Sequence, residues 1–179
     1  TVTGFEALTA NDIDFTGIAT LDTLAGTDTV RGADGIDWAL TSTDRQATNH
    51  GITFSNVEEI VAVNAGLTGS SAAETYTINS GGDLDVVTSA NYGVADKSLN
   101  VSGIASDKWV DASSGSDKLI ASASENVTLT GTSKEVGSSA MQFQGIDRVE
   151  NGKLVGTSTG SDAFVVTGDE SFNVQDIEF

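Results

Sequence analysis

The sequence contains no cysteine and no proline in 179 residues. Without cysteine, no disulfide can stabilise the fold and no thiolate can bind zinc. Without proline, every residue keeps a backbone N–H for a β-ladder, as long stacks of strands require. Long apolar runs are also missing. None approaches the roughly 20 residues of a membrane-spanning helix, so we expect no membrane insertion.

Basic residues are scarce, with 8 against 26 acidic residues and a formal net charge of -18. Such a surface repels phosphate, which excludes nucleic acid as a partner. The excess of carboxylates serves solubility. It also allows an alternative, in which some carboxylates lie close together and bind a cation such as Ca²⁺.

Hydrophobic residues make up 38% of the chain and charged residues 19%. Both values are below the averages of about 45–50% and about 25% for globular domains, which favours a thin core along a stack of short strands. Helical patterns are poor, and short β-rich runs end at Gly, Asn, Asp or Ser. We expect residues 1–179 to form one repetitive segment cut from a longer protein.

A first sequence element recurs as an aromatic residue or Val, any residue, Gly or Asn, and then an apolar residue. We interpret it as a strand, a sharp corner and a second strand, with a left-handed Gly or Asn at the corner. Its clear copies begin at Phe15, Phe54 and Phe143, weaker copies begin at Val2 and Val101, and a shortened copy begins at Phe172.

A second element reads Gly or Ala, any residue, an acidic residue, any residue, and an apolar residue. We expect the acidic side chain to cap its own turn by accepting hydrogen bonds from nearby N–H groups. Its copies centre on Asp28, Asp37, Glu74, Asp107, Asp117 and Asp162.

The copies of the first element that begin at Phe15, Phe54, Val101 and Phe143 are 39, 47 and 42 positions apart. These distances predict two coils of roughly 20 residues between successive copies, with loops of unequal length that carry any function. The predicted fold is an all-β, right-handed parallel β-helix (a β-solenoid), with a β-sandwich as the alternative. The predicted core includes Phe15, Ile18, Phe54, Val57, Phe143, Ile146 and Phe164.

The two elements resemble those of repetitive bacterial surface adhesins of the filamentous haemagglutinin-like and autotransporter-like kind. The resemblance implies an extracellular, non-catalytic stalk or ligand-display surface that acts in adhesion and biofilm formation. It also implies host or bacterial surface glycans or proteins as partners, together with neighbouring repeats of the parent chain.

The second element also resembles the nonapeptides of repeats-in-toxin proteins, which bind Ca²⁺ between coils. The nearest match runs from Gly32 to Ala39. The resemblance implies Asp28, Asp34 and Asp37 as candidate Ca²⁺ ligands. Asp28 and Asp37 are nine positions apart, but Gln46 occupies the next such position, so the tandem is short.

We find no catalytic motif, and the single histidine, His50, stands alone beside Gly51. A carbohydrate-active β-helix is the enzymatic alternative, because stacked coils place carboxylates at the spacing that glycoside hydrolysis uses. Trp38 and Tyr92 are the candidate ligand contacts, since exposed rings of this kind stack on sugars. Tyr76 and Trp109 occupy positions expected to face the core.

Overall fold

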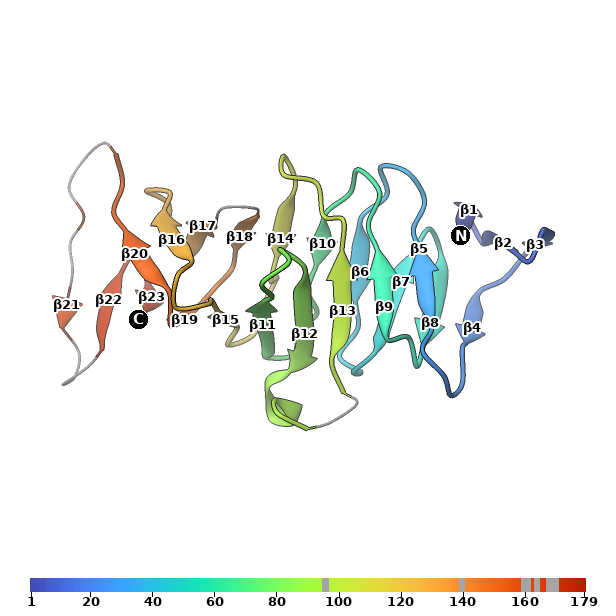
Figure 1. Cartoon of the computed structure of the whole chain (residues 1–179), viewed down its shortest axis with the longest axis horizontal. Helices are drawn as coiled ribbons and strands as arrows, with labels where there is room; N and C mark the ends of the chain where they lie inside the picture. The colour runs from blue at the N-terminus through green and yellow to red at the C-terminus, as the bar shows by residue number, and fades with distance from the viewer. Residues whose placement is uncertain (95–96, 139–140, 159–161, 163–164, 167–170) are drawn as a thin grey trace.

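The structure is a computed structural model that describes residues 1–179 except 95–96, 139–140, 159–161, 163–164 and 167–170. The described residues contain no α-helix. Their strands form two long mixed sheets that extend along the longest axis of the molecule, with a small three-stranded sheet at the N-terminal end (Figure 1). The prediction of an all-β fold is therefore confirmed.

Each long sheet has ten strands in the described part of the chain. Sheet 1 contains, in spatial order, β20 (Lys153–Val155), β16 (Asn126–Leu129), β17 (Glu135–Gly137), β18 (Gln142–Gln144), β14 (Trp109–Asp111), β10 (Leu67–Thr68), β6 (Trp38–Leu40), β7 (Gln46–Asn49), β8 (Ile52–Ser55) and β4 (Thr20–Asp22). Sheet 2 contains β21 (Val165–Val166), β22 (Phe172–Val174), β23 (Ile177–Glu178), β19 (Arg148–Glu150), β15 (Lys118–Ile120), β11 (Glu74–Ile78), β12 (Leu84–Thr88), β13 (Leu99–Ser102), β9 (Glu59–Val61) and β5 (Thr29–Arg31). The small sheet contains β1 (Val2–Gly4), β2 (Ala7–Ala10) and β3 (Ile13–Thr16).

The strands follow one another in a repeating unit. Each unit has a three-stranded antiparallel meander, one strand in the opposite sheet, and one strand back in the sheet of the meander. Units 2, 3 and 4 are β6–β10, β11–β15 and β16–β20, and β21–β23 form a further meander. Because the chain changes sheet three times per unit, successive meanders lie in opposite sheets. Unit 1 is β1–β5, with its meander in the small sheet.

Parallel pairing joins strands whose numbers differ by four, as in β6 with β10 and β14 with β18. Inside the meanders the pairing is antiparallel, so the expected β-helix of parallel strands alone is wrong. The reason is local, because tight turns such as His50-Gly51, with φ of 50° and 87°, reverse the chain directly. Each spacing of 39 to 47 residues therefore corresponds to one five-stranded unit and not to two plain coils.

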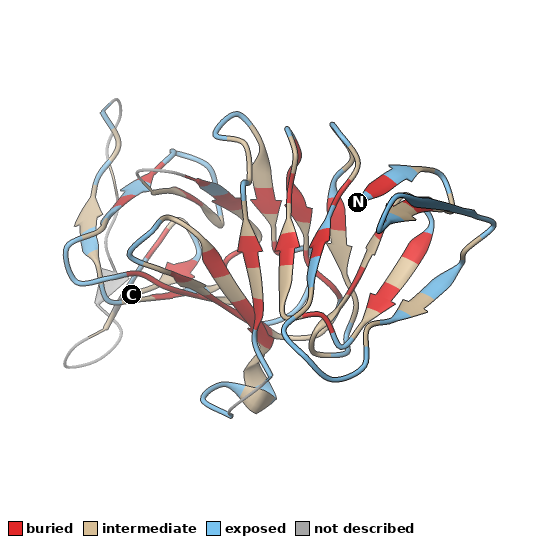
Figure 2. Ribbon diagram, turned by 45° about the vertical axis from the view of Figure 1, so that its right-hand side comes forward, coloured by how far each residue is buried: buried red, intermediate tan, exposed pale blue. Residues whose placement is uncertain are grey.

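The core consists of apolar side chains stacked along the parallel ladders. In sheet 1, Trp38, Leu67, Val110 and Phe143 occupy matching positions on four neighbouring strands, and all are at most 1% exposed. Figure 2 shows the buried residues, in red, concentrated within the strands. A strand of three residues can bury only its inward-facing positions, which explains the low apolar content.

Most of the predicted core residues are buried. Phe54, Val57, Phe143, Ile146 and Tyr76 are at most 1% exposed, and Ile18 packs against the core while partly buried. Trp109 is also partly buried. Phe164 lies outside the described residues.

Phe15 was expected in the core but is 40% exposed. Its counterpart Phe54 lies on β8, which pairs with β7 on one side and with β4 on the other. In the described part of the chain, β3 pairs with β2 alone. The position of Phe15 and Phe54 is therefore apolar in both units. Its side chain is buried only where its own strand has a paired strand on each side.

The predicted left-handed corners are confirmed in four copies and wrong at Gly4, the corner of the Val2 copy, which lies in β1 without a positive φ. Gly17, Asn56, Gly103 and Gly145 have φ of 70°, 59°, 70° and 79°. At three of these corners, the N–H of the following residue donates to the carbonyl twelve positions earlier, in Ile18 to Glu6, Val57 to Arg45 and Ile146 to Lys134. The corner thus binds the first turn of its own meander and fixes where the chain leaves for the opposite sheet.

A second left-handed position follows the first single strand of each unit. It is occupied by Leu24, Asn64, Ser113 and Asn151, with φ of 65°, 50°, 65° and 63°. Asn tolerates this backbone best among residues with a side chain, and Leu is strained there. Leu24 is also 70% exposed, so its side chain contributes little to burial.

We predict that Leu24→Asn raises the free energy of unfolding by about 1 kcal/mol, because it relieves left-handed strain at an exposed site. Urea unfolding followed by circular dichroism measures the change. The control is Ile13→Asn, which removes a 57% exposed apolar side chain from a strand. An equal or larger gain in the control would contradict the backbone explanation.

Candidate functional site

Two carboxylates of the second element, those of Asp37 and Asp117, bond to the neighbouring parallel strand. Asp37 Oδ1 accepts from the N–H of Gly66 at 2.6 Å, and Asp117 Oδ1 accepts from the N–H of Glu74 at 2.8 Å. Asp147 Oδ2 likewise accepts from the N–H of Asp117 at 3.0 Å. The expectation of local capping is therefore wrong for Asp37 and Asp117. It is confirmed for Glu74 and Asp162, which accept from the nearby N–H groups of Ser70 and Thr157.

The three candidate Ca²⁺ ligands have separate surroundings. Asp34 Oδ1 accepts from Asn64 Nδ2 at 2.7 Å, and Asp37 bonds to Gly66 as above. The backbone N–H of Asp28 donates to Glu58 Oε2, and the buried Oδ2 of Asp28 has no hydrogen-bond partner among the described residues. Within the described ranges, no group of three acidic or histidine side chains is arranged to hold a metal. Ca²⁺ binding stays a prediction.

A buried polar cluster lies at the start of β11. Glu74 is 2% exposed and accepts from Tyr76 Oη at 2.7 Å, from the N–H of Ser70 and from the Ser70 hydroxyl. Burial raises the pKa of the Tyr76 phenol well above its usual value, and the Glu74 carboxylate adds to this effect. The cluster is internally bonded and closed to solvent, so it is structural in character.

Asp117 belongs to the same region and is 1% exposed. Its Oδ2 is buried and without a hydrogen-bond partner in the described part of the structure. The pKa of Asp117 is raised to about 6, mainly by burial, and the negative charges of Glu74 and Asp147 contribute to this rise. The hydrogen bond from the N–H of Glu74 and the charge of Lys134 act in the opposite direction.

The structure separates the two candidate ligand contacts. Trp38 is fully buried, with its ring centroid 5.6 Å from that of Phe54 and its Nε1 donating to the carbonyl of Val61. The prediction that Trp38 is exposed is therefore wrong, because the position after Asp37 is the inward-facing residue of β6. Tyr92 is 51% exposed, as a surface contact requires.

Tyr92 lies in an insertion between β12 and β13 that also contains the 3₁₀ turn η1 (Ser89–Asn91). Ten residues join these strands, whereas two residues, His50 and Gly51, join the equivalent strands β7 and β8. The eight additional residues match the difference between the spacings of 47 and 39. Figure 1 shows this insertion projecting beyond the ends of the neighbouring strands.

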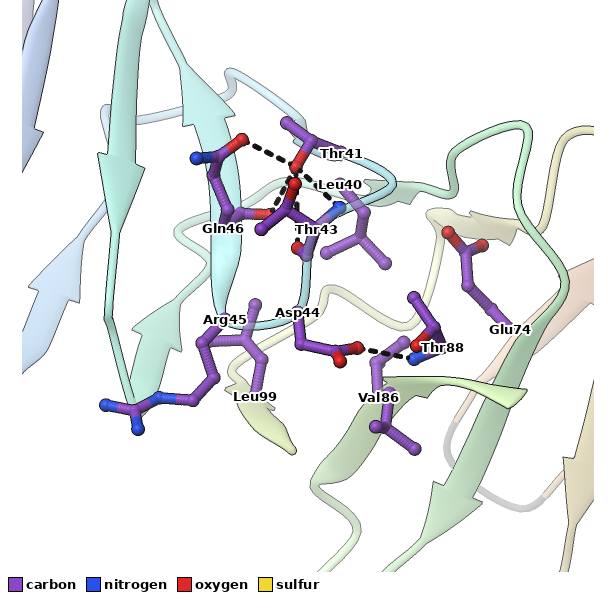
Figure 3. A pocket seen from close by; sticks show the side chains of 11 residues that line it. Leu40, Thr41, Thr43, Asp44, Arg45, Gln46, Glu74, Val86, Thr88 and Leu99 are labelled. Carbon is purple, nitrogen blue, oxygen red and sulfur yellow. Dashed lines mark hydrogen bonds between the residues drawn. The ribbon is translucent and has the colours of Figure 1, made fainter. Parts of the chain in front are cut away.

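The insertion is anchored by the first turn of unit 2. Figure 3 shows Asp44 pointing toward Thr88, whose backbone N–H donates to Asp44 Oδ1 at 2.8 Å. The side-chain amide of Asn91 donates to Asp44 Oδ2, and the hydroxyls of Thr75 and Ser89 are 3.0 Å apart. The cavity drawn in Figure 3 has a volume of about 20 Å³, enough for about one water molecule and too small for a metabolite.

The Tyr92 ring is also fixed from β15. Lys118 Nζ lies 4.8 Å from the ring centroid, in a cation–π contact, and pairs with Glu150 at 3.4 Å. Tyr92 is nevertheless 51% exposed, so this contact leaves about half of the residue open to solvent.

Two hollows adjoin the insertion on the outer face of sheet 2. The first, of about 360 Å³, is lined by residues that include Thr77, Asp85, Asn91 and Tyr92. The second, of about 580 Å³, is lined by residues that include Arg45, Glu58, Asp85 and Asn100. Because the two hollows share Asp85 and Ser98, we treat them as one groove, called the insertion groove below.

Sequence reasoning identified Tyr92 but not its partners in the groove. Thr77, Asp85 and Asn100 come together through the register of β11, β12 and β13, in which Thr77 lies opposite Asp85 and Asp85 opposite Asn100. The spacing of 47 residues was the available signal, because it located an insertion within this unit. Nothing in the sequence indicated which strand faces it would cover.

No protein-family model, curated protein or solved structure matches this chain. Among the described residues, no helix is long and apolar enough to cross a membrane.

We predict that Asp117→Asn changes how stability depends on pH. A native pKa near 6, above the usual value of about 4, means that the folded state holds this proton more tightly. The stabilisation is complete below pH 4 and is lost as the pH rises through 6, by at most about 3 kcal/mol. The variant does not titrate at this position and keeps an oxygen to accept from the N–H of Glu74.

The free energy of unfolding of the variant, relative to the unmodified protein, should therefore increase between pH 4 and pH 6.5. Urea titrations at several pH values measure it, with the exposed Asp107→Asn as the control. A constant difference across this range would show that Asp117 does not titrate there.

Proposed function

We propose that the chain is a segment of an extracellular, non-catalytic adhesin-type protein, in which a β-solenoid of mixed sheets displays binding elements. The observation that carries the proposal is the repetition of one unit along a single axis, with an insertion that projects from one unit. This design separates a repetitive scaffold from a variable contact surface. The resemblance of the two sequence elements to those of bacterial surface adhesins supports the same function.

The surface chemistry favours partners other than nucleic acids. The net charge of -18 disfavours phosphate backbones and anionic lipid surfaces. The groove beside Tyr92 is open and is lined by both polar and apolar groups, which suits a surface glycan or protein at the cell exterior. Neighbouring repeats of a longer chain would then serve to position this face, and a role in biofilm formation would follow from adhesion between cells.

A Ca²⁺-stabilised module is the second candidate, favoured by the buried, unpaired Oδ2 of Asp28. Under the adhesin proposal, the thermal midpoint should shift by less than about 2 °C between chelator and a few millimolar Ca²⁺. Circular dichroism measures the midpoint. A rise of about ten degrees or more would reveal strong linkage to Ca²⁺ and would favour the second candidate.

We predict that beads coated with this chain adhere to bacterial or host cells at least about fivefold more than beads coated with an unrelated acidic protein. Flow-cell counting of attached beads measures adhesion, and high salt tests for nonspecific charge effects. Adhesion equal to that of the acidic control protein on every surface tested would refute the proposed function.

A further inference from the structure

The insertion groove combines a fixed aromatic ring with a row of hydrogen-bonding groups. Tyr92 is held by Lys118, and the turn that carries it is held by Asp44. A ring that is already positioned loses little conformational entropy when a ligand stacks on it. The groove therefore provides a preformed platform and not only an exposed side chain.

The floor of the groove supplies acceptors for hydroxyl groups. Asn100 Nδ2 donates to Asp85 Oδ1 at 2.9 Å, which fixes both side chains and leaves Asp85 Oδ2 and Asn100 Oδ1 as acceptors. Thr77 lies opposite Asp85 on the next strand and can both donate and accept. Acceptors beside an aromatic face match a sugar ring, which presents C–H groups on its face and hydroxyls at its edge.

We propose that the insertion groove binds a short, neutral oligosaccharide, with Tyr92 stacking on one sugar ring and Asp85 and Asn100 accepting from its hydroxyls. This inference rests on the proposed function and names the class of ligand. The hollows of about 360 and 580 Å³ fall in the range of small-ligand sites and adjoin at Asp85 and Ser98, which suits a chain of several sugars.

The charges of the groove select against acidic sugars. Asp85 lines both hollows and carries a negative charge. Of the nearby cations, Arg45 pairs with Glu58 and Lys118 pairs with Glu150, whereas Lys97 is exposed within the insertion. A uronic acid carboxylate at the floor of the groove would therefore meet repulsion at Asp85.

The test is isothermal titration of the whole chain with cellotetraose, maltotetraose, N-acetylchitotetraose and trigalacturonate. At least one neutral probe should bind, and trigalacturonate should bind at least about tenfold more weakly. Tyr92→Ala should weaken the neutral probe about tenfold, and Tyr92→Phe should retain affinity within about threefold, because stacking needs the ring alone. Asp85→Ala should weaken binding by a similar factor to Tyr92→Ala.

The matched control is Phe5→Ala, which removes a 70% exposed ring that lines neither hollow and should leave binding unchanged. Circular dichroism confirms that each variant is folded. The inference is overturned if no neutral probe binds, if trigalacturonate binds best, or if Tyr92→Ala binds as the unmodified chain does. If coated beads adhere to cells but the chain binds no saccharide, this inference alone is overturned. If the beads do not adhere and the chain binds no saccharide, the proposed function is overturned as well.

Discussion

The structure depends on main-chain hydrogen bonds that join short strands in parallel register along the molecule. A strand such as β14 or β15 has three residues and buries few side chains, so it gains little by itself. Its stability comes from neighbours on both sides and from the stacked apolar positions that this register aligns. The complete absence of proline follows from the same constraint, because each missing N–H would interrupt a ladder that has few bonds to lose.

The carboxylates of Asp117 and Asp147, next to the starts of β15 and β19, serve this register. The N–H of Glu74 donates to the side chain of Asp117, and the N–H of Asp117 donates to the side chain of Asp147. These two bonds hold β11, β15 and β19 in register. Burying such groups contributes little net stability and can oppose it, as the raised pKa of Asp117 indicates. Their effect is on specificity, because a slipped strand would leave a buried carboxylate and a buried N–H without partners.

The sequence predicted the elements that depend on local chemistry and failed where several strands decide the outcome. The corners at Asn56 and Gly145 were predictable because a left-handed backbone requires Gly or Asn, and the inward positions beside them followed from that corner. The meanders were missed because a turn such as His50-Gly51 looks the same in a loop and in a hairpin. Phe15 and Trp38 were misplaced because burial depends on which strands lie beside them. Tyr92 was found as an exposed ring, but its groove depends on the register of three strands.

The insertion that carries Tyr92 illustrates why a binding element can be added to this scaffold at small cost. Lengthening a connection from two to ten residues costs about 1.4 kcal/mol in loop-closure entropy. The bonds to Asp44 and the contact with Lys118, at about 1 kcal/mol each, offset this cost. Because the anchors come from side chains and not from the ladder, the parallel register of β9 and β13 is unchanged beneath the insertion. The two-residue turn of unit 2 occupies the equivalent place, so the same scaffold can hold a turn or a ligand-contacting loop there without altering its core.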